Sequence, residues 1–533
     1  MAEKVKAQEL AQFQKEISIA EFFTKNRHLL GFDSARKAIL IGVKEAVDNA
    51  LDACQESHIL PEITVEIKAI EGKEDRLIMI VEDNGPGIVK ENIGNVFGKL
   101  LYGSKFHRLR QSRGQQGIGI SAAVLYGQLT TGKNAKITSK IGKNHPAHYY
   151  EMHVDTKTNN PVIVKEKTEN WTHKENGTRV EIEMEAQYQK GKQSVDEYIK
   201  QTAIANPAAT IKYTNPLNEK TTFPKSTQEL PKEPKEIKPH PYGIELGIFI
   251  RMLQGTEEGT IASFLHKEFS RVSQQQAAEM CEKVQIGPRT RPKTILREDA
   301  EKLYQAMQQA QLMAPPTDCL SPIGEETLLS GIKKEINADF YATCTRKPAV
   351  YRGNPFQIEV GVAYGGDLDK EETVRVMRLA NRVPLLYQAG ACAITKAILE
   401  TNWKAYGLQQ SKSSIPSGPA IIIVHMASVW VPFTSESKEA IAHYDEILKE
   451  IKLGLQECGR KLTAYIRKHV HAEEQKKKAE LFEKLIPELA NALAELAEEK
   501  REPIIAGLMK KLEQKLPMLL GEANDTKQSE TKA

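Results

Sequence analysis

The chain has 533 residues, too many for one hydrophobic core, so about two to four domains are expected. Its formal net charge of +4 is too small to indicate nucleic-acid binding without a local basic patch. The six cysteines lie far apart with no CxxC pair, which argues against a disulfide framework or a zinc site. No window approaches the roughly 18 consecutive apolar residues of a membrane span, and the polar N-terminus is not a signal peptide. We therefore expect a cytoplasmic protein with reduced thiols and no membrane contact.

The first 240 residues mix helical and strand patterns. Residues 1–30 are expected to form a mobile, partly helical leader, and a helix is predicted from residue 34 to about 56. A loop rich in glycine and basic residues covers 102–119, and residues 215–242, rich in Pro, Lys and Glu, are interpreted as a linker. Strands are predicted at 63–67, 77–81, 134–140, 148–154 and 178–184. This mixture, with its hairpin-like spacing, indicates an α+β sandwich.

The second half begins with a block of short helices over about 245–311. Strand patterns return between 317 and 433, clearest at 356–363 and 420–424. From about 436 to 486 few residues break a helix, and 50 residues would form a helix of roughly 75 Å. Prolines at 487, 503 and 517 are then expected to divide a charged helical tail, and residues 524–533 to be disordered.

The first group of candidate functional residues lies on the helix predicted from residue 34. Glu45, Asp48, Asn49 and Asp52 are spaced i, i+3, i+4 and i+7, so they share one helix face. Three acids and an amide stacked in this way repel one another unless a cation or water relieves them. A solvated face is one explanation, and a functional face on a packed helix is favoured because most neighbouring residues are apolar or small.

The second group is the sequence Asp83-Asn84-Gly85-Pro86-Gly87, which directly follows an apolar strand. Such a sequence can simply form a turn. Alternatively, the Asp83 carboxylate accepts a hydrogen bond from an exocyclic amine, while the glycines allow a ligand to approach closely. The residues by themselves leave both interpretations open.

The third group is the glycine-rich segment from Arg113 to Ser121, which leads into a helix. Glycines before a helix expose backbone N–H groups, and the helix N-terminus adds positive potential, so both favour a phosphate. The segment is neither a Walker A loop nor a Rossmann fingerprint. Ser104, Lys105 and the basic residues 107–113 would complement a polyphosphate, although a solvated loop explains these basic residues equally well.

The order and spacing of these groups resemble the ATPase family of gyrase, the heat-shock chaperone Hsp90, histidine kinases and MutL. The resemblance implies a Bergerat-fold pocket for ATP and Mg²⁺. Glu45 would polarise the attacking water, Asn49 would give an oxygen to Mg²⁺, and Asp83, assisted by Thr178, would recognise adenine. The nucleotide-binding residues implied are Asn49, Asp83, Gly87, Ser104, Lys105, Gly114, Gln115, Gln116, Gly117, Ile118, Gly119, Ile120, Ser121, Thr178 and Lys438.

Within that family, the helical block after the ATPase region resembles the helix-two-turns-helix insert of the B subunit of type IIB DNA topoisomerases (topoisomerase VI). The strings at 100–106 and 431–439 are also similar to that subunit. The resemblance implies an α+β multidomain protein with five parts. These are a leader or strap (1–30), a Bergerat-fold ATPase α/β sandwich with its linker from about 215 (31–240), a helix-two-turns-helix domain (241–316), a ribosomal-S5-like α/β transducer with a long helix from about 436 (317–470), and a helical C-terminal region with a disordered tail (471–533).

Lys438 is predicted to lie in the first turn of the long helix, where a cation opposes the helix dipole. Glu436 and Glu439 could offset that effect, and an ordinary surface lysine is the alternative. The resemblance implies that Lys438 reaches the γ-phosphate and reports its presence to the transducer.

After residue 470 there is no cluster of acids on strand ends and no convincing nucleophilic tyrosine, so this chain is not expected to cut DNA. The resemblance places the tyrosine and the Mg²⁺-dependent cleavage site on a separate A subunit. Two A and two B subunits would form a heterotetramer, closed by ATP-dependent dimerisation of the ATPase domains, that relaxes and decatenates double-stranded DNA near the nucleoid. Basic residues at 289, 291, 293 and 297 suit DNA phosphates or a solvated surface. The alternative function is an ATP-dependent clamp of the MutL or Hsp90 type without topoisomerase activity.

Overall fold

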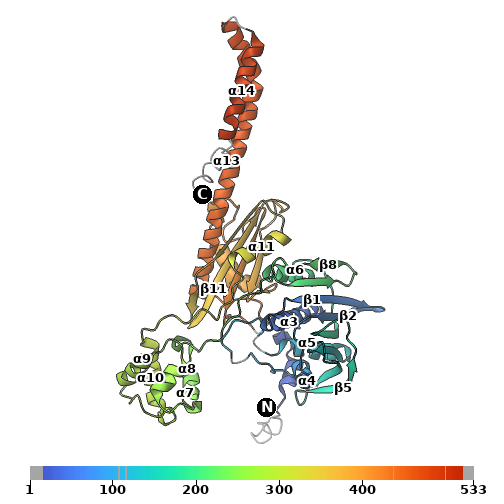
Figure 1. The fold of residues 1–533 in the computed structure, drawn as a ribbon, viewed down its shortest axis with the longest axis vertical. Coiled ribbons are helices and arrows are strands. Elements are labelled where there is room, and N and C mark those ends of the chain that lie inside the picture. Colours follow the sequence, from blue (N-terminus) through green and yellow to red (C-terminus); the bar gives the residue numbers. More distant parts are fainter. Residues whose placement is uncertain (1–15, 106–107, 115–116, 436, 498–499, 520–533) are drawn as a thin grey trace, which may run out of the picture.

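The computed structural model describes residues 16–105, 108–114, 117–435, 437–497 and 500–519. Figure 1 shows two α/β parts side by side, a small all-helical part at one flank, and a long helix that projects away from them. The described part of the leader contains the short helix α2 (Ile19–Lys25) and the 3-10 turn η1 (Arg27–Leu30). No helix in these five ranges combines the length and the apolar character needed to cross a membrane.

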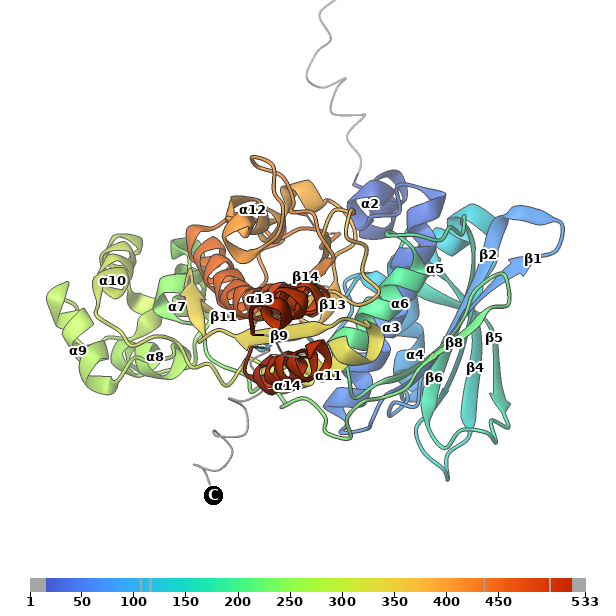
Figure 2. The ribbon, with the colours of Figure 1, turned by 90° about the horizontal axis from the view of Figure 1, so that it is seen from above.

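The N-terminal part is built on one eight-stranded sheet with the order β5-β4-β3-β6-β2-β1-β7-β8. Its helices gather on one face of that sheet, as Figure 2 shows. The strands are β1 (Glu62–Ile70), β2 (Lys73–Glu82), β3 (Ala135–Lys140), β4 (Ala147–Asp155), β5 (Asn160–Glu169), β6 (Gly177–Glu185), β7 (Thr210–Thr214) and β8 (Lys220–Phe223). The helices are α3 (Ala35–Glu56), α4 (Lys90–Gly98), α5 (Gly119–Thr131) and α6 (Val195–Ala205). The predicted helix and the five predicted strands are therefore present.

Strands β5, β7 and β8 were not predicted, and β8 lies inside the expected linker. That part of the linker prediction is wrong, because Ile211 to Thr214 pair with residues 220–223 and extend the sheet. Both outer strands, β5 and β8, are mostly exposed and carry Lys, Glu or Thr. Edge strands are commonly charged, which protects their unpaired backbone, so they lack the hydrophobic alternation of an inner strand.

Helix α3 positions one wall of the candidate site. Val43, Val47 and Leu51 are completely buried between the sheet and the other helices. Since these residues recur at intervals of four, the polar residues between them must point to other sides of the helix. Asn49 is exposed and Glu45 is half-buried, whereas Asp48 and Asp52 are buried.

A small helical part follows, with a core of its own that includes Phe249, Phe264 and Leu303. The predicted block of short helices is thus present. Its helices are α7 (Leu246–Gly255), α8 (Ile261–Glu268), α9 (Gln274–Lys283) and α10 (Arg297–Gln309).

The third part is a six-stranded sheet with the order β10-β11-β14-β12-β13, in which β9 also pairs with β11. Its central strand, β14, is buried along its whole length. Helix α11 contacts α6, so the two α/β parts pack directly against each other. The elements are α11 (Glu325–Glu335), β9 (Phe340–Thr345), β10 (Ala349–Tyr351), β11 (Asn354–Tyr364), β12 (Arg375–Ala380), β13 (Val383–Pro384), α12 (Ala393–Glu400) and β14 (Ala420–Ser428).

The long helix, α13 (Asp445–Ala497), begins nine residues later than predicted and does not end at Pro487. Its 53 residues span about 80 Å. The prediction that the prolines divide the tail is wrong: α14 (Arg501–Leu519) also contains both later prolines. A proline inside a helix removes a backbone hydrogen bond and costs about 3 kcal/mol. Here α14 packs along the distal half of α13 (Figure 1), and Ile486 and Ala490 are buried there. This packing offsets the cost, so the helix continues through Pro487.

Candidate functional site

A cavity of about 540 Å³ opens beside α3. This volume is suitable for a nucleotide-sized ligand. Thirteen of the predicted site residues line it: Glu45, Asn49, Asp83, Gly87, Ser104, Lys105, Gly114, Gly117, Ile118, Gly119, Ile120, Thr178 and Lys438. Ser121 is absent from the lining and buried, and its hydroxyl donates to the Ile118 carbonyl at 2.9 Å. Gln115 and Gln116 lie outside the described residues.

Asp83 lies at the end of β2, on one wall of the cavity. Its Oδ1 accepts hydrogen bonds from the backbone N–H groups of Gly85 at 2.8 Å and Thr178 at 3.1 Å. Both bonds fall on one oxygen, so Oδ2 can accept from an amine in the cavity. Burial raises the pKa of Asp83 to about 6, so the carboxylate is ionised at neutral pH.

Gly87 is required by the backbone packing of the Asp83 turn. Its φ is +74°, and a Cβ atom there would lie 2.1 Å from the Lys140 carbonyl oxygen. The glycine therefore allows the Asp83 turn to pack closely against the end of β3. It also lines the cavity, so the structure is compatible with a close ligand as well.

Glu45 lies where α3 meets the start of α5. A Cβ atom on Gly119 would lie 1.8 Å from Glu45 Oε2, so the carboxylate lies directly against the backbone of the glycine-rich segment. Burial by itself would raise the pKa of Glu45, but the charges of Lys44 and Lys438 outweigh burial and lower it. Asn49, one helical turn later, is close to Gly114 across the cavity, where a Cβ on the glycine would lie 3.7 Å from Asn49 Oδ1. An ionised carboxylate and an exposed amide thus face the glycine-rich segment together.

Lys438 lines the cavity, but it is not in the first turn of the long helix. It lies in the loop between β14 and α13, where its φ is +53°. The loop is closed by a bridge between Phe433 and Ile441 and by a 2.9 Å hydrogen bond from Thr434 N to the Ala440 carbonyl. The helix-dipole argument for Lys438 is therefore wrong, because the left-handed backbone and the bridge exclude helix there. Burial lowers the pKa of Lys438, and the charge of Glu45 partly offsets that effect.

An ion pair holds the Lys438 loop against α3. Lys37 Nζ pairs with the next loop residue, Glu439, and with Asp33 at 3.1 Å. The Lys37 and Glu439 side chains are only 10% and 7% exposed. Burial disfavours the charge on Lys37, yet the two carboxylates outweigh it and raise the pKa. This contact, unpredicted from the sequence, fixes where Lys438 enters the cavity.

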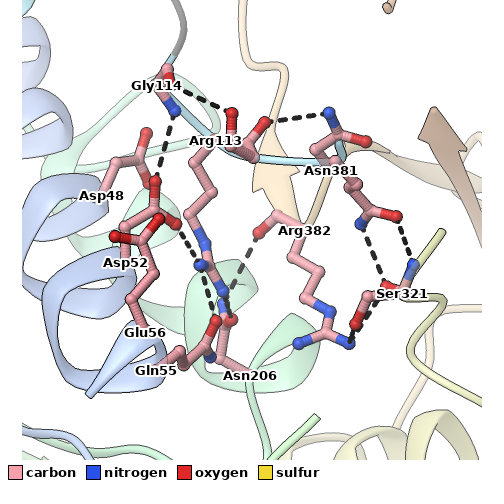
Figure 3. Close-up of polar contacts among 12 residues, drawn as sticks. Asp48, Asp52, Gln55, Glu56, Arg113, Gly114, Asn206, Ser321, Asn381 and Arg382 are labelled. Atoms are coloured by element: carbon pink, nitrogen blue, oxygen red, sulfur yellow. Dashed lines mark hydrogen bonds and ion pairs between the residues drawn. The ribbon is translucent and has the colours of Figure 1, made fainter. Parts of the chain in front are cut away.

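The basic residues before the glycines were expected either to complement a polyphosphate or to lie on a solvated loop, and Arg113 does neither. Its guanidinium is buried and pairs with Asp52 Oδ1 at 2.6 Å (Figure 3). Arg113 is not among the residues that line the cavity. Lys105 does line the cavity, but its Nζ is 2.6 Å from Asp52 Oδ2. Two cations hold the pKa of Asp52 well below its usual range, in spite of burial. Asp52 therefore holds Lys105 and Arg113, two cations that precede the glycines, in place against α3.

Four further polar residues of the lining, Lys44, Asn92, Tyr102 and Ser437, were missed. Lys44 Nζ lies 3.2 Å from Glu45 Oε1 and balances its charge. The adjacency of a lysine to the candidate glutamate could have indicated this role. Nothing in the sequence near residue 92 indicates the cavity.

The comparisons with known proteins agree on one family. Residues 35–188 match the family model of histidine kinase-, DNA gyrase B- and HSP90-like ATPases, and residues 315–478 match the topoisomerase VI B subunit transducer. The predicted ATPase fold is thus confirmed. The ATPase region of Saccharomyces cerevisiae topoisomerase II aligns at only 10% identity with a TM-score of 0.38, which supports no further conclusion.

Three relatives are type 2 DNA topoisomerase 6 B subunits. The Methanosarcina barkeri protein is 50% identical over 507 residues, which covers 94% of this chain and 81% of the relative. The Archaeoglobus fulgidus protein is 48% identical over 92% of this chain and 80% of its own length. The Natronomonas pharaonis protein is 36% identical over an alignment that covers 93% of this chain and 85% of the relative. Such identity over nearly the whole length shows that the chain belongs to the family of type 2 DNA topoisomerase 6 B subunits.

Proposed function

We propose that the chain binds ATP in the cavity beside α3 and uses its hydrolysis to gate the passage of one DNA duplex through another. As a member of its family, the chain is an ATP-hydrolysing subunit of a type 2 DNA topoisomerase. The observation that carries the proposal is the meeting of Glu45, Asp83 and Lys438 on one cavity, although they lie on three separate elements.

The residues suggest a division of roles within the cavity. Asp83 Oδ2 accepts from the adenine amine, and Thr178, whose N–H orients the carboxylate, lies beside the base. Glu45, ionised and placed against Gly119, orients and polarises the attacking water. The backbone N–H groups of the glycine-rich segment hold the phosphates at the N-terminus of α5.

Lys438 contributes positive charge beside Glu45, where the γ-phosphate would lie. Because its loop leads from β14 into α13, a contact with the γ-phosphate would link hydrolysis to the transducer. Loss of that contact on phosphate release would free the transducer to move.

A Mg²⁺ ion fits the cavity through Asn49. Magnesium is commonly bound by one or two protein oxygens together with phosphates and waters. The Asn49 amide is exposed within the cavity and close to Gly114, so it can supply one such oxygen. The ion would neutralise the charge on the phosphates.

The partners follow from the family. The name of the relatives implies an A subunit and DNA. We further propose two A and two B subunits, with the described leader residues 16–30 crossing to a second B subunit when ATP closes the dimer. The C-terminal helices α13 and α14 would meet the A subunit, and the complex would act on the nucleoid in the cytoplasm.

The first test combines the chain with its A subunit, supercoiled plasmid, Mg²⁺ and ATP. Relaxation that requires both proteins and the nucleotide is expected. Glu45→Ala should retain nucleotide binding but lower hydrolysis by about 10²- to 10⁴-fold, leaving a closed dimer. ATP hydrolysis without any change in DNA topology would instead favour the clamp function, and loss of ATP binding in Glu45→Ala would show that Glu45 shapes the pocket.

A further inference from the structure

The segment that precedes the glycines, residues 110–114, is bonded directly to the transducer. The Gln111 side chain forms two hydrogen bonds with the Ser321 backbone, donating to the carbonyl at 3.0 Å and accepting from the N–H at 2.7 Å. The Gln111 N–H also donates to the Cys319 carbonyl at 3.1 Å. From the other side, Asn381 Nδ2 donates to the Ser112 carbonyl at 3.0 Å. These contacts join residues more than 200 positions apart.

The same segment is bonded to the helices of the ATPase domain through Arg113. Its Nη1 donates to Asp52 at 2.6 Å and to Gln55 at 2.8 Å, both on α3, and its Nη2 donates to Asn206 at the end of α6. Figure 3 shows the Arg113 side chain running between α3 and the transducer residues. Since α3 also carries Glu45 and Asn49, the segment is held between the catalytic helix and the transducer.

On the transducer side, Asn381 connects the segment to the base of the Lys438 loop. Its side chain donates to the Ser428 carbonyl at 2.9 Å and accepts from the Ser428 N–H at 2.9 Å. Ser428 is the last residue of β14, and the chain continues from it to Lys438. One buried side chain therefore contacts both the segment before the glycines and the strand that leads to the γ-phosphate lysine.

Arg382, the neighbour of Asn381, extends these contacts into the transducer core. Its Nη2 donates to the Ser321 carbonyl at 3.1 Å, and its backbone N–H donates to His425 Nε2 at 2.9 Å. His425 Nδ1 then donates to Glu359 at 2.7 Å, and Glu359 accepts from Gly324 N–H at the start of α11. Burial lowers the pKa of His425, so its ring is neutral and can accept from the Arg382 backbone.

The contact between the ATPase domain and the transducer contains buried polar groups that are incompletely paired. Arg113 and Arg382 are both buried, and within the described residues each has an Nε atom without a hydrogen-bond partner. Burial and the positive charge of Arg113 lower the pKa of Arg382 to about 9. Buried unpaired donors and like charges destabilise the closed contact. The free-energy difference between the closed contact and an open one is therefore small enough for a ligand to shift.

We propose that residues 110–114 couple the movement of the glycine-rich segment to the movement of the Lys438 loop. The coupling depends on the hydrogen bonds of Gln111 and Asn381, which hold this segment against the transducer. This inference rests on the proposed function and adds a second connection to the one through Lys438. Gln111 and Asn381 are positioning residues, because they lie outside the cavity lining and act through their neighbours. Closure around the phosphates would then reach the transducer even before Lys438 contacts the nucleotide.

The test compares Gln111→Leu with Gln128→Leu in the complete complex with the A subunit. Gln128, on α5, forms the same pair of bonds with the Val154 backbone, at 3.0 Å and 2.9 Å, but within the ATPase domain. Both variants lose equivalent hydrogen bonds, so both should lower the melting temperature. Only Gln111→Leu should lower the number of strand passages per ATP hydrolysed, by at least about fivefold, with hydrolysis and the KM for ATP within about twofold of the unmodified protein.

A second variant covers the case in which Gln111→Leu does not fold. Asn381→Asp removes the bonds donated to the Ser112 and Ser428 carbonyls but retains the bond accepted from the Ser428 N–H. It should show the same loss of strand passage per ATP. An unchanged ratio in Gln111→Leu and Asn381→Asp, or an equal loss in Gln128→Leu, would overturn the inference. No ATP hydrolysis or no topological change in the unmodified complex would instead count against the proposed function.

Discussion

The buried ion pair between Lys37 and Glu439 allows a quantitative test of how the Lys438 loop is positioned. Lys37→Met keeps the length of the side chain but removes its charge. Glu439 would then be left 7% exposed, with Oε2 already without a hydrogen-bond partner among the described residues. Removing one partner of a buried ion pair costs about 3–5 kcal/mol when the other charge stays in place.

The loop has another response, since Glu439 can turn toward solvent. In that case the free energy of unfolding decreases by less than about 3 kcal/mol. Lys438, the preceding residue, then leaves the cavity, and ATP hydrolysis decreases. The expected result is therefore a loss of stability, a loss of activity, or both. Glu439→Gln in the Lys37→Met background should recover most of the stability, because no buried charge remains.

Urea unfolding followed by circular dichroism, together with steady-state ATP hydrolysis, measures both responses in the single and double variants. Lys25→Met is the matched control, because Lys25 forms a 2.9 Å ion pair with Glu21 in which both side chains are exposed. Exposed pairs of this kind contribute little, so neither measurement should change. If Lys37→Met also left both measurements unchanged, the argument that this pair positions Lys438 would be refuted.

Three further predictions concern the cavity. Because burial raises the pKa of Asp83 to about 6, the carboxyl is protonated below that pH and no longer accepts from the adenine amine. ATP affinity, measured by calorimetry, should therefore weaken as the pH falls through about 6, and Asp83→Asn should bind weakly at every pH; a flat profile for the unmodified protein would contradict this. Gly119→Ala should displace the Glu45 carboxylate, since the new Cβ would lie 1.8 Å from Oε2, and hydrolysis should fall roughly 10²-fold while nucleotide binding persists. Lys438→Ala should retain nucleotide binding, seen with a fluorescent ATP analogue, and lower hydrolysis by roughly 10²-fold; unchanged turnover and strand passage would rule out its role.

The sequence by itself was sufficient for the local parts of the site. The spacing of Glu45 and Asn49 on a helix, the Asp83 turn after a strand, and the glycines before α5 all depend on residues close together in the chain. Helical periodicity and turn chemistry are short-range effects, so the pattern of residue types is enough to predict them. Five of the six inner strands of the first sheet were predicted for the same reason, since burial on one face produces a regular alternation.

Only the tertiary structure decided which residues from distant segments meet. Arg113 belongs to a basic stretch that suited either a polyphosphate or a solvated loop, but folding buries it beside Asp52, away from the cavity. Lys438 was assigned to a helix because no helix breaker is nearby, whereas a bridge between Phe433 and Ile441 and a contact with Lys37 hold it in a loop. In each case the deciding interaction is a buried contact whose free energy depends on the packing of separate elements, and local sequence patterns carry no information about such a partner.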